Sequence, residues 1–417
     1  MTTSLVVELE ELQRLFSGTP VPRDDYNHHF FMKPRQLLEE AQEEFSAFLD
    51  GHFENLRGGR NNRAAEALRS HLQWTFLGLA DAAMRGKWLL VSLDDRAYTS
   101  DPLLKRYGFK YAPTKAIVDY LERNGFATVK RGRQYKNNPA RTRLYPNPEL
   151  ASALVGFHLQ TITDIEPPYV VINEPDGRWK EVIAELPIDH PDRLEMTQIN
   201  DFLKGHTWAC KGPVQLKYKH DVFNSGRLYT DYQELPDRRV RIRINTLIDG
   251  EQLCEVDFSA NHLRMAMAVL HGEDIGDTPY EDIMELAKIR DRDRVKTFVT
   301  TALSASSRTA ANSSWNHDNL GAEFFGRLEL AMIKRFPKLK LYDSWGIQAQ
   351  SLEGSILRQV MLQGMEKDIV CLPVHDAVAI PQQHEKWAVD AMLEAWERVV
   401  STSESVAARA RVKVDRA

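Results

Sequence analysis

The sequence predicts a multidomain α+β protein, on three observations. The chain has 417 residues, enough for two or three domains of about 100–200 residues each. Apolar residues at three- and four-residue spacing, as in residues 37–48, predict amphipathic helices. Short β-prone runs bounded by turn residues, such as 253–258 and 369–380, predict strands. The composition, 43% hydrophobic and 27% charged, excludes a disordered or fibrous protein.

Charge and cysteine content limit the class of protein further. The 54 Lys and Arg residues against 59 Asp and Glu residues give a net charge of -5, so nucleic-acid binding would need local basic patches. The three cysteines are scattered, which excludes a disulfide framework or a Cys-rich zinc site and fits a reducing compartment. We see no signal peptide and no apolar run of the ~18–20 residues that a membrane span needs. We therefore expect a cytoplasmic protein with no membrane partner.

Residues 1–60 form an acidic region with helical periodicity, and residues 61–155 follow a different pattern. A helix over 64–84 leads to a short helix over 101–106 and to a helix from Pro113 that ends at Asn124-Gly125. Two strands, 126–130 and 143–145, come next. Helix, turn, helix and a two-stranded ribbon outline a winged helix, a DNA-binding domain.

The predicted ribbon and helix carry cations that suit phosphate contacts. No acidic residue lies among the basic residues of the ribbon, and one further lysine on the preceding helix could face a groove. The residues expected to bind nucleic acid here are Lys115, Lys130, Arg131, Arg133, Lys136, Arg141 and Arg143. The alternative is a solvated basic loop on a small helical domain.

Two acidic residues occupy positions from which they could meet. Asp257 lies where the strand 253–258 passes into a helix that Ser259 would cap, with Leu263, Met267 and Leu270 on its buried face. His375-Asp376 interrupts two β-prone runs and so would lie at the tip of a hairpin. Each pattern alone is more often structural than catalytic.

Cations and polar residues on two predicted helices complete the pattern. Arg292 and Lys296 are four apart in a run from 289 to 303, and i, i+4 spacing places both on one face that Thr300 and Ser304 continue. Two cations in line can hold a polyphosphate, although a solvated face is the alternative. Gln350 begins a further predicted helix, on which Glu353 and Arg358 project away from the apolar face.

In this order and spacing, the motifs resemble those of family A DNA polymerases and the related single-subunit phage RNA polymerases. The first palm motif matches residues 257–264, from Asp257-Phe258-Ser259 to Leu263-Arg264. The fingers helix matches Arg292 and Lys296, the Gln-led palm helix matches Gln350, the hairpin matches His375-Asp376, and a Gly-Arg-Leu element matches 226–228. The resemblance covers roughly residues 220–385.

The resemblance implies a right-hand polymerase palm with helical fingers and a small thumb, beside the N-terminal winged helix. The expected division is 1–60, an acidic helical region; 61–155, winged helix; 156–255, small thumb and start of the palm; 256–288, palm; 289–340, fingers; and 341–417, palm with the His-Asp hairpin and a C-terminal helix.

The resemblance also implies roles for individual residues. Asp257 and Asp376 would bind two Mg²⁺ ions, with Mn²⁺ able to substitute, because hard cations prefer carboxylate and phosphate oxygens. Arg292 and Lys296 would bind the triphosphate, and His375 would join them in the catalytic set. The nucleotide would also contact Phe258, Ser259, His262, Thr300 and Ser304, and DNA primer or template would contact Arg227, Arg264 and Gln350.

Four positions depart from the DNA-making members. His262 replaces a Glu that crowds the 2′-hydroxyl of a ribonucleotide, Thr300 and Ser304 replace aromatic residues on the fingers helix, and Ala377 replaces a frequent Glu. We find no exonuclease motif before residue 220. The sequence thus predicts a compact DNA polymerase, tolerant of ribonucleotides and able to make primers, that serves a phage or mobile element with an accessory replication protein.

Alternatives remain open at this point. One is a single-subunit RNA polymerase or primase, and a weaker one is a nuclease that uses the same two ions. From another class, the chain could be a non-catalytic winged-helix replication initiator or regulator that keeps a palm as a scaffold.

Overall fold

The computed structural model describes residues 29–31, 35–101, 104–105, 107–132, 141–173, 181–182, 186–219, 221–237, 241–400 and 409–417. The chain divides into two compact units. The first contains residues up to Asp164 together with segments 207–212 and 234–252, and the second contains 165–206, 213–233 and 253–417. Segments 207–212 and 234–252 thus belong to the N-terminal unit, although the sequence analysis grouped them within 156–255. The finer domain boundaries stay predictions.

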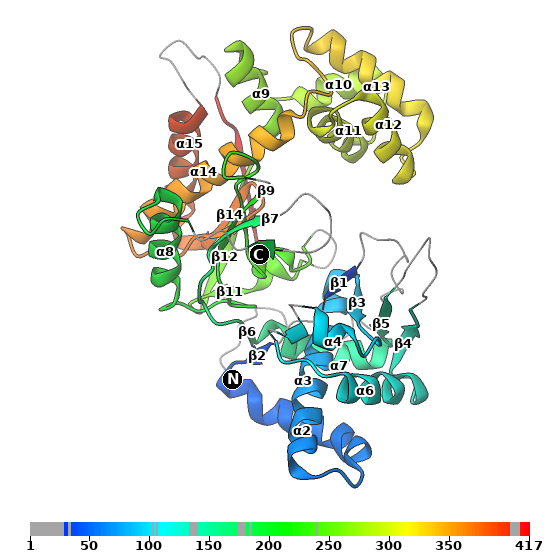
Figure 1. Ribbon diagram of the computed structural model, residues 1–417. Helices are drawn as coiled ribbons and strands as arrows, with labels where there is room; N and C mark the ends of the chain where they lie inside the picture. Colours follow the sequence, from blue (N-terminus) through cyan, green and yellow to red (C-terminus); the bar gives the residue numbers. More distant parts are fainter. Residues whose placement is uncertain are drawn as a thin grey trace. The chain divides into compact units, whose positions relative to one another are not determined.

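The N-terminal unit is a four-stranded sheet with helices packed around one central helix (Figure 1). Its sheet has the order β1-β3-β5-β4, and β2 pairs with β6. The helix α3 packs on α6, α7 and β5, and residues 75–84 are buried on all sides, as expected of a core helix. The elements are β1 (His29–Phe31), β2 (Gln36–Leu37), α2 (Glu39–Arg57), α3 (Asn62–Arg85), β3 (Trp88–Val91), α4 (Ala97–Ser100), α6 (Tyr111–Arg123), β4 (Ala127–Lys130), β5 (Thr142–Pro146), α7 (Pro148–Leu159), β6 (Thr161–Ile162), η3 (Arg243–Asn245) and β11 (Leu247–Ile248).

Most elements expected between residues 61 and 155 are confirmed. The helix expected from Pro113 is α6, and its Ile117, Val118 and Leu121 are fully buried. The two expected strands are β4 and β5, which pair antiparallel. Of the short helix expected over 101–106, only residues 104–105 are described as helical, and the rest of that helix lies largely outside the described residues.

A buried ionic cluster joins three parts of the N-terminal unit. The Asp81 carboxylate lies 2.8 Å from the Arg35 guanidinium and 2.6 Å from that of Arg85. Burial alone would raise the pKa of Asp81, but the two guanidinium groups more than offset it and hold the pKa well below its usual range. His158 lies 3.6 Å from the same carboxylate and 3.6 Å from the Cys210 Sγ. The cluster thereby fixes the segment 207–212 to the helical core.

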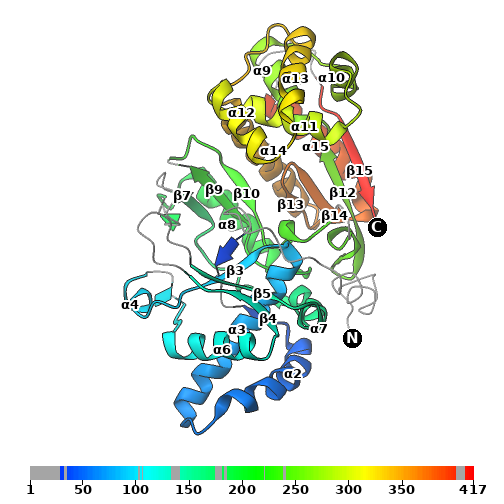
Figure 2. The same ribbon diagram turned by 90° about the vertical axis from the view of Figure 1, so that its right-hand side faces the viewer.

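The C-terminal unit contains two sheets (Figure 2). One has the order β10-β9-β7-β8; in the other, β12 lies between β14 and β15, β13 pairs with β14, and β11 pairs with the first residues of β12. The elements are β7 (Val170–Asn173), β8 (Glu181–Val182), α8 (Pro191–Leu203), β9 (Gln215–Lys219), β10 (Arg227–Tyr229), η2 (Tyr232–Glu234), β12 (Glu251–Phe258), α9 (Asn261–His271), α10 (Pro279–Ala287), α11 (Arg292–Ser304), α12 (Arg308–His317), α13 (Ala322–Arg335), α14 (Trp345–Met365), β13 (Leu372–Val374), β14 (Ala377–Pro381), η4 (Gln382–His384), α15 (Glu385–Val400) and β15 (Val412–Arg416).

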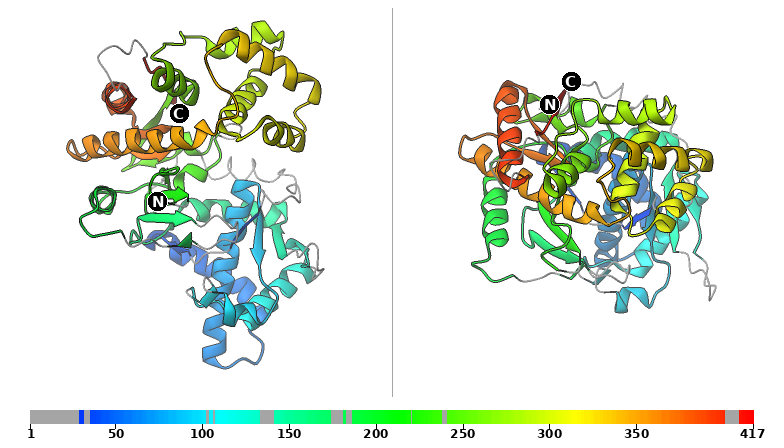
Figure 3. Two further views of the ribbon diagram at one scale, coloured as in Figure 1. Left: turned by 45° about the horizontal axis from the view of Figure 1, so that its top comes forward. Right: turned by 90° about the horizontal axis from the view of Figure 1, so that it is seen from above.

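Helices α10 to α13 form a cluster with its own aromatic core. The Phe298 ring lies 5.8 Å from that of Trp315 and 5.2 Å from that of Phe325, in edge-to-face geometry. The long α14 packs on α11 at one end and on α15 further along, so it connects this cluster with the C-terminal sheet (Figure 3). Among the described residues, no helix is both long enough and apolar enough to cross a membrane.

We predict that the stability of the N-terminal unit falls in mild acid because of His71. This buried imidazole accepts a hydrogen bond from the Lys110 backbone N–H at the start of α6, 2.8 Å away, so it must be neutral at that nitrogen. Burial lowers the pKa of His71 to about 4 from 6.5. Since the unfolded state binds the proton first as pH falls, the stabilisation is complete above pH 6.5 and is lost as pH approaches 4.

Urea unfolding of wild type and His71→Gln across this pH range checks the prediction. The difference between the two free energies of unfolding should shrink by up to about 3 kcal/mol from pH 6.5 to pH 4. A difference that is independent of pH would contradict it.

Candidate active site

Pairing of β12 with β14 brings the two predicted aspartates together. Asp257, near the end of β12, lies opposite Ala377, the first residue of β14. Val374 and Ala377 also pair, so His375-Asp376 is a two-residue turn, with His375 at a φ of 59°. Asp376 is therefore one residue from the partner of Asp257, at the same end of the sheet.

The charge of Asp257 acts on the pKa of Asp376, which indicates that the two carboxylates are near one another. Burial and the negative charges of Glu353 and Asp257 raise the pKa of Asp376 to about 7, although His262 and Lys296 act in the opposite direction. Carboxylates this close repel one another unless cations lie between them. The arrangement therefore favours cation binding.

The residues present fit a magnesium site that is completed by substrate. Among the described residues, no group of three or more His, Cys, Asp or Glu side chains is placed to hold a metal by itself. Mg²⁺ is commonly bound through one or two carboxylates and substrate phosphates. Asp257 and Asp376 supply such a pair, with oxygen donors only.

The helix α11 presents cations toward this pair. It begins at Arg292 because the Asp291 side chain caps it, accepting a hydrogen bond from the Arg294 N–H at 3.0 Å. The predicted run from 289 thus starts three residues too early. Val295, Phe298 and Val299 are buried on one side, whereas the other side is exposed and carries Arg292, Lys296, Thr300 and Ser304.

Arg292 and Lys296 differ in their contacts. The Arg292 Nε donates to the Glu281 carboxylate at 2.9 Å, and its guanidinium lies 5.2 Å from the centre of the Tyr280 ring. Lys296 acts on the pKa of Asp376 through its charge. Within the described part of the chain, no carboxylate lies at ion-pair distance from Lys296.

Beneath the aspartates lies a buried polar network centred on Glu353. This carboxylate is 2.7 Å from the His262 Nε2 and 3.5 Å from the Arg227 guanidinium, and it accepts a hydrogen bond from the Asn261 amide at 3.4 Å. The Trp396 indole N–H donates to the Asn261 oxygen at 3.1 Å. The network therefore links α9, α14, α15 and β10.

The His262–Glu353 contact is an ion pair. Burial alone would lower the pKa of His262, but the adjacent Glu353 carboxylate more than offsets this and raises it. Conversely, burial would raise the pKa of Glu353, and the His262 charge holds it below its usual value. The prediction that Glu353 projects away from the packed face was wrong, because Glu353 is only 2% exposed.

Two glycines allow β10 to lie directly on α14. A Cβ atom at Gly354 would lie 1.8 Å from the Gly226 carbonyl oxygen, and Gly226 has a φ of +61°. The Ser225 hydroxyl donates to the Gln350 side-chain oxygen at 2.8 Å. This close approach brings Arg227 and Gln350 to the same face of α14.

Several expectations around the first aspartate need correction. Ser259 does not cap the following helix: Ala260 takes that position with a left-handed φ of 52°, and the helix starts at Asn261. Leu270 was expected to be buried but is 48% exposed, because it lies in the last turn of α9. Gln350 does not begin a helix, since α14 starts five residues earlier at Trp345.

Two predicted contact residues are buried inside the unit. Phe258 is 5% exposed and Arg264 is 3% exposed. The Arg264 Nε donates to the Ser259 carbonyl at 2.8 Å, and its guanidinium lies 3.7 Å from Asp274. Arg264 thus supports the end of β12 from within, and its burial gives no support to a nucleic-acid contact.

The sequence analysis missed Lys413, which lies on a strand that it did not predict. β15 pairs antiparallel with β12, and the register places Lys413 opposite Asp257. The Lys413 Nζ is 2.8 Å from the Asp257 Oδ2. The alternation in residues 411–416 could have indicated a strand, but nothing local could have indicated its partner.

The basic residues of the N-terminal unit contact partners within that unit. Lys115 lies 2.5 Å from Asp119, and Arg131 lies 2.8 Å from the same residue and also contacts Glu122. The remaining described ones follow the same pattern: Lys130 lies 4.7 Å and Arg143 6.0 Å from the Trp88 ring, and Arg141 lies 3.9 Å from Asp101. Arg133 and Lys136 lie outside the described residues, and the DNA contact of all seven stays a prediction.

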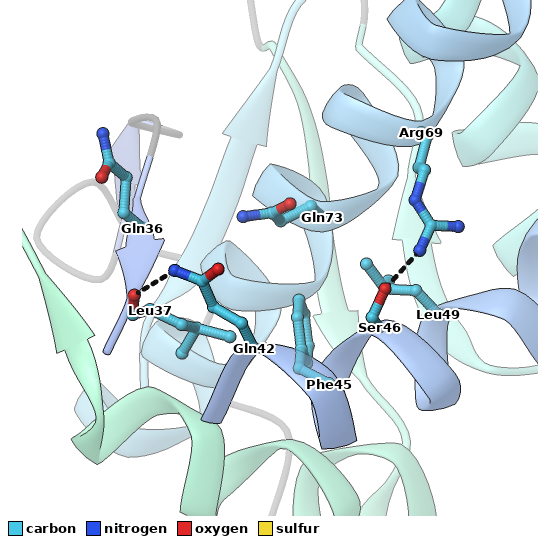
Figure 4. A pocket seen from close by; sticks show the side chains of 8 residues that line it. All are labelled: Gln36, Leu37, Gln42, Phe45, Ser46, Leu49, Arg69 and Gln73. Carbon is cyan, nitrogen blue, oxygen red and sulfur yellow. Dashed lines mark hydrogen bonds between the residues drawn. The ribbon is translucent and has the colours of Figure 1, made fainter. Parts of the chain in front are cut away.

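A separate pocket of about 230 Å³ lies in the N-terminal unit between β2, α2 and α3 (Figure 4). Its Gln42 amide donates to the Leu37 carbonyl at 3.1 Å, and its Arg69 guanidinium donates to the Ser46 hydroxyl at 2.6 Å. The pocket shares no residue with the Asp257 cluster.

Comparisons with known proteins give limited guidance. A scan against protein-family models finds no match, and a search of curated proteins also finds none. A solved structure, the POL domain of Pol1 from M. smegmatis in complex with DNA primer-template and dNTP, is similar at 14% identity and a TM-score of 0.31. The similarity covers 88% of this chain but 66% of that one, less than two thirds of its length. Similarity this low assigns no function, which must rest on the residues themselves.

We predict that Gly354→Ala destabilises the C-terminal unit, because the added methyl group would collide with the Gly226 carbonyl and push β10 from α14. Overpacking of this kind costs about 1–3 kcal/mol. Gly326→Ala is the matched control: Gly326 lies within α13 with nothing near its Cβ position, and alanine there should stabilise by up to about 1 kcal/mol. Thermal unfolding of both variants measures the difference in stability. Equal unfolding midpoints would contradict the close approach of β10 to α14.

Proposed function

We propose that this chain is a metal-dependent, template-directed nucleotidyltransferase of the family A polymerase type. The observation that carries the proposal is the β12–β14 register, which sets Asp257 beside Asp376 near the exposed cations of α11. Two carboxylates and a cationic helix face are what nucleotidyl transfer requires.

Each group of residues has its own role in the proposed reaction. When bound, two Mg²⁺ ions (or Mn²⁺) activate the attacking 3′-oxygen and hold the leaving pyrophosphate. Asp257 and Asp376 would hold the metal ions through their carboxylate oxygens, while Arg292 and Lys296 bind the triphosphate and offset the charge that develops on it. Arg227 on β10 and Gln350 on α14 bind primer or template, and His375 lies in the turn beside the reacting groups.

The proposed architecture follows from this division. The sheet that contains β12 and β14 is the palm, helices α10 to α13 are the fingers, and α8 with the β7–β10 sheet is the small thumb. Thr300 and Ser304 continue the exposed face of α11 and face the incoming nucleotide. Ser259, which is half-buried beside Asp257, completes the nucleotide-binding set.

We further propose that the N-terminal unit contains a winged-helix DNA-binding domain. The order α3, β3, α4, α6, β4, β5 and the sheet order β3-β5-β4 support this assignment. DNA phosphates would compete with Asp119 and Glu122 for Lys115 and Arg131, so binding would be strongly salt-dependent. A winged helix joined to a minimal polymerase suits a phage or mobile element that replicates with an accessory protein.

A second candidate, a primase or RNA polymerase, is favoured by one observation. The position that crowds the 2′-hydroxyl in DNA-making relatives is His262, and its imidazole is held by Glu353 rather than by substrate. No carboxylate therefore projects from position 262 toward the sugar. The same chain could thus accept ribonucleotides and start primers.

We predict that Asp257→Asn and Asp376→Asn each strongly lower the rate of Mg²⁺-dependent primer extension. The loss should exceed the roughly 10–100-fold decrease that follows removal of a residue that contacts a metal ligand but not the metal. The reason is that each change removes an anionic metal ligand while keeping the shape of the side chain. Asp390→Asn, an exposed carboxylate on α15, is the control and should leave the rate unchanged. Absence of any extension by the wild type, primed or unprimed, would instead favour a non-catalytic initiator.

We predict that moving the carboxylate back to position 262 restores sugar selection. His262→Glu alone would place two carboxylates in one buried site, because Glu353 lies 2.7 Å from His262, so the test combines it with Glu353→Gln. The double variant should prefer dNTPs over NTPs about 10–100-fold more strongly than wild type does. Competing incorporation of both substrates measures this, with Glu353→Gln alone as control. Equal selectivity in wild type and double variant would exclude His262 from sugar choice.

A further inference from the structure

The strand β15 is fixed on both sides of Lys413, and its position next to Asp257 is therefore defined. The Ser259 N–H donates to the Arg411 carbonyl at 2.7 Å, and the Arg411 Nε donates to Asp277 at 2.6 Å. Beyond Lys413, the Arg416 guanidinium donates to both oxygens of Glu385 at 2.7 and 2.6 Å. These anchors hold Lys413 at the level of the aspartate pair.

Lys413 already occupies one of the two oxygens with which Asp257 could bind a metal ion. Its Nζ lies 2.8 Å from the Asp257 Oδ2, and its charge also senses Asp376 and Arg292. An ammonium group and a divalent cation cannot both contact the same carboxylate oxygen without strong repulsion. A metal ion that binds through Oδ2 would therefore displace the ammonium group.

Displacement is inexpensive because the lysine is close to solvent. The Lys413 side chain is 68% exposed, and exposed ion pairs typically contribute about 0.2–1 kcal/mol. The long flexible stem lets the ammonium move while the backbone of β15 stays paired. The charge of Lys413 also interacts with that of Arg292, one of the two cations proposed to bind the triphosphate.

We propose that Lys413 is the built-in counter-ion of Asp257 and that, when a divalent metal ion displaces it, its ammonium binds the phosphate oxygens of the incoming nucleoside triphosphate. This proposal rests on the proposed function. The exchange makes metal binding and triphosphate binding mutually favourable. The metal ion takes Asp257 from Lys413, and the triphosphate takes Lys413 from Asp257. Neither ligand alone satisfies both Asp257 and Lys413.

Mn²⁺ binding to the full chain without nucleotide or nucleic acid tests the first half of the proposal. Titration followed by the electron paramagnetic resonance signal of free Mn²⁺ should show binding to Lys413→Met about 2- to 10-fold tighter than to wild type. Lys413→Arg, which keeps the charge, should stay near wild type. Lys386→Met removes an exposed cation from α15 without touching the ion pairs that hold β15, and it should leave the affinity unchanged. Equal affinity of Lys413→Met and wild type overturns the proposal.

Primer extension tests the second half. Lys413→Met should need less Mg²⁺ for half-maximal activity but show a KM for nucleotide raised about 3- to 10-fold, because a phosphate ligand is lost. Opposite shifts of these two constants separate the proposed role from a merely structural one, which would move both in the same direction. Shifts in the same direction overturn the proposal.

A further arm distinguishes failure of this inference from failure of the proposed function. If Asp257→Asn leaves Mn²⁺ binding unchanged in wild type and in Lys413→Met alike, then Asp257 holds no metal and the proposed function itself fails. If Asp257→Asn weakens binding while Lys413→Met does not strengthen it, only the role of Lys413 is refuted.

Discussion

The antiparallel pairing of β12 with β14 is the constraint on which the whole site depends. Successive side chains of a strand point to opposite faces, so a shift of one residue would turn Asp257 away from Asp376. The two-residue turn at His375-Asp376 fixes that register, and the left-handed φ of His375 is part of the turn. A backbone feature of a few residues thus determines whether two distant carboxylates form one site.

The polar residues below this sheet end are organised by charge rather than by apolar packing. Glu353 is buried, yet its carboxylate is matched by His262, Arg227 and Asn261, so that its burial is compensated. At Asp376, by contrast, burial and the charges of Glu353 and Asp257 outweigh those of His262 and Lys296 and raise the pKa. The ion cluster around Glu353 is therefore structural, whereas the negative charge around Asp376 favours binding of a cation.

Local patterns predicted the parts of the site that local geometry determines. The strand that carries Asp257, the common face of Arg292 and Lys296, and the hairpin at His375-Asp376 each follow from side-chain periodicity or turn composition. The helix–ribbon order between residues 61 and 155 was predictable for the same reason. The polymerase interpretation itself rested on the order of these motifs, and similarity to solved structures adds little to it.

Contacts between distant segments could not be predicted in this way. Glu353 was expected on an open face, but β10 and α9 cover that face because two glycines let the backbones approach. Leu270 matched the apolar period of α9 and is nevertheless 48% exposed, because it lies in the last turn of that helix. Lys413 was missed because its importance arises only from the pairing of β15 with β12.

The same pairing has a consequence for the solubility of the protein. β15 occupies the outer edge of β12, and it presents Lys413, Asp415 and Arg416 as exposed charges along that edge. Without residues 409–417, the unpaired N–H and C=O groups of β12 would become a template on which strands of other molecules could add. By covering the edge of β12, residues 409–417 therefore also protect the protein from aggregation through that strand.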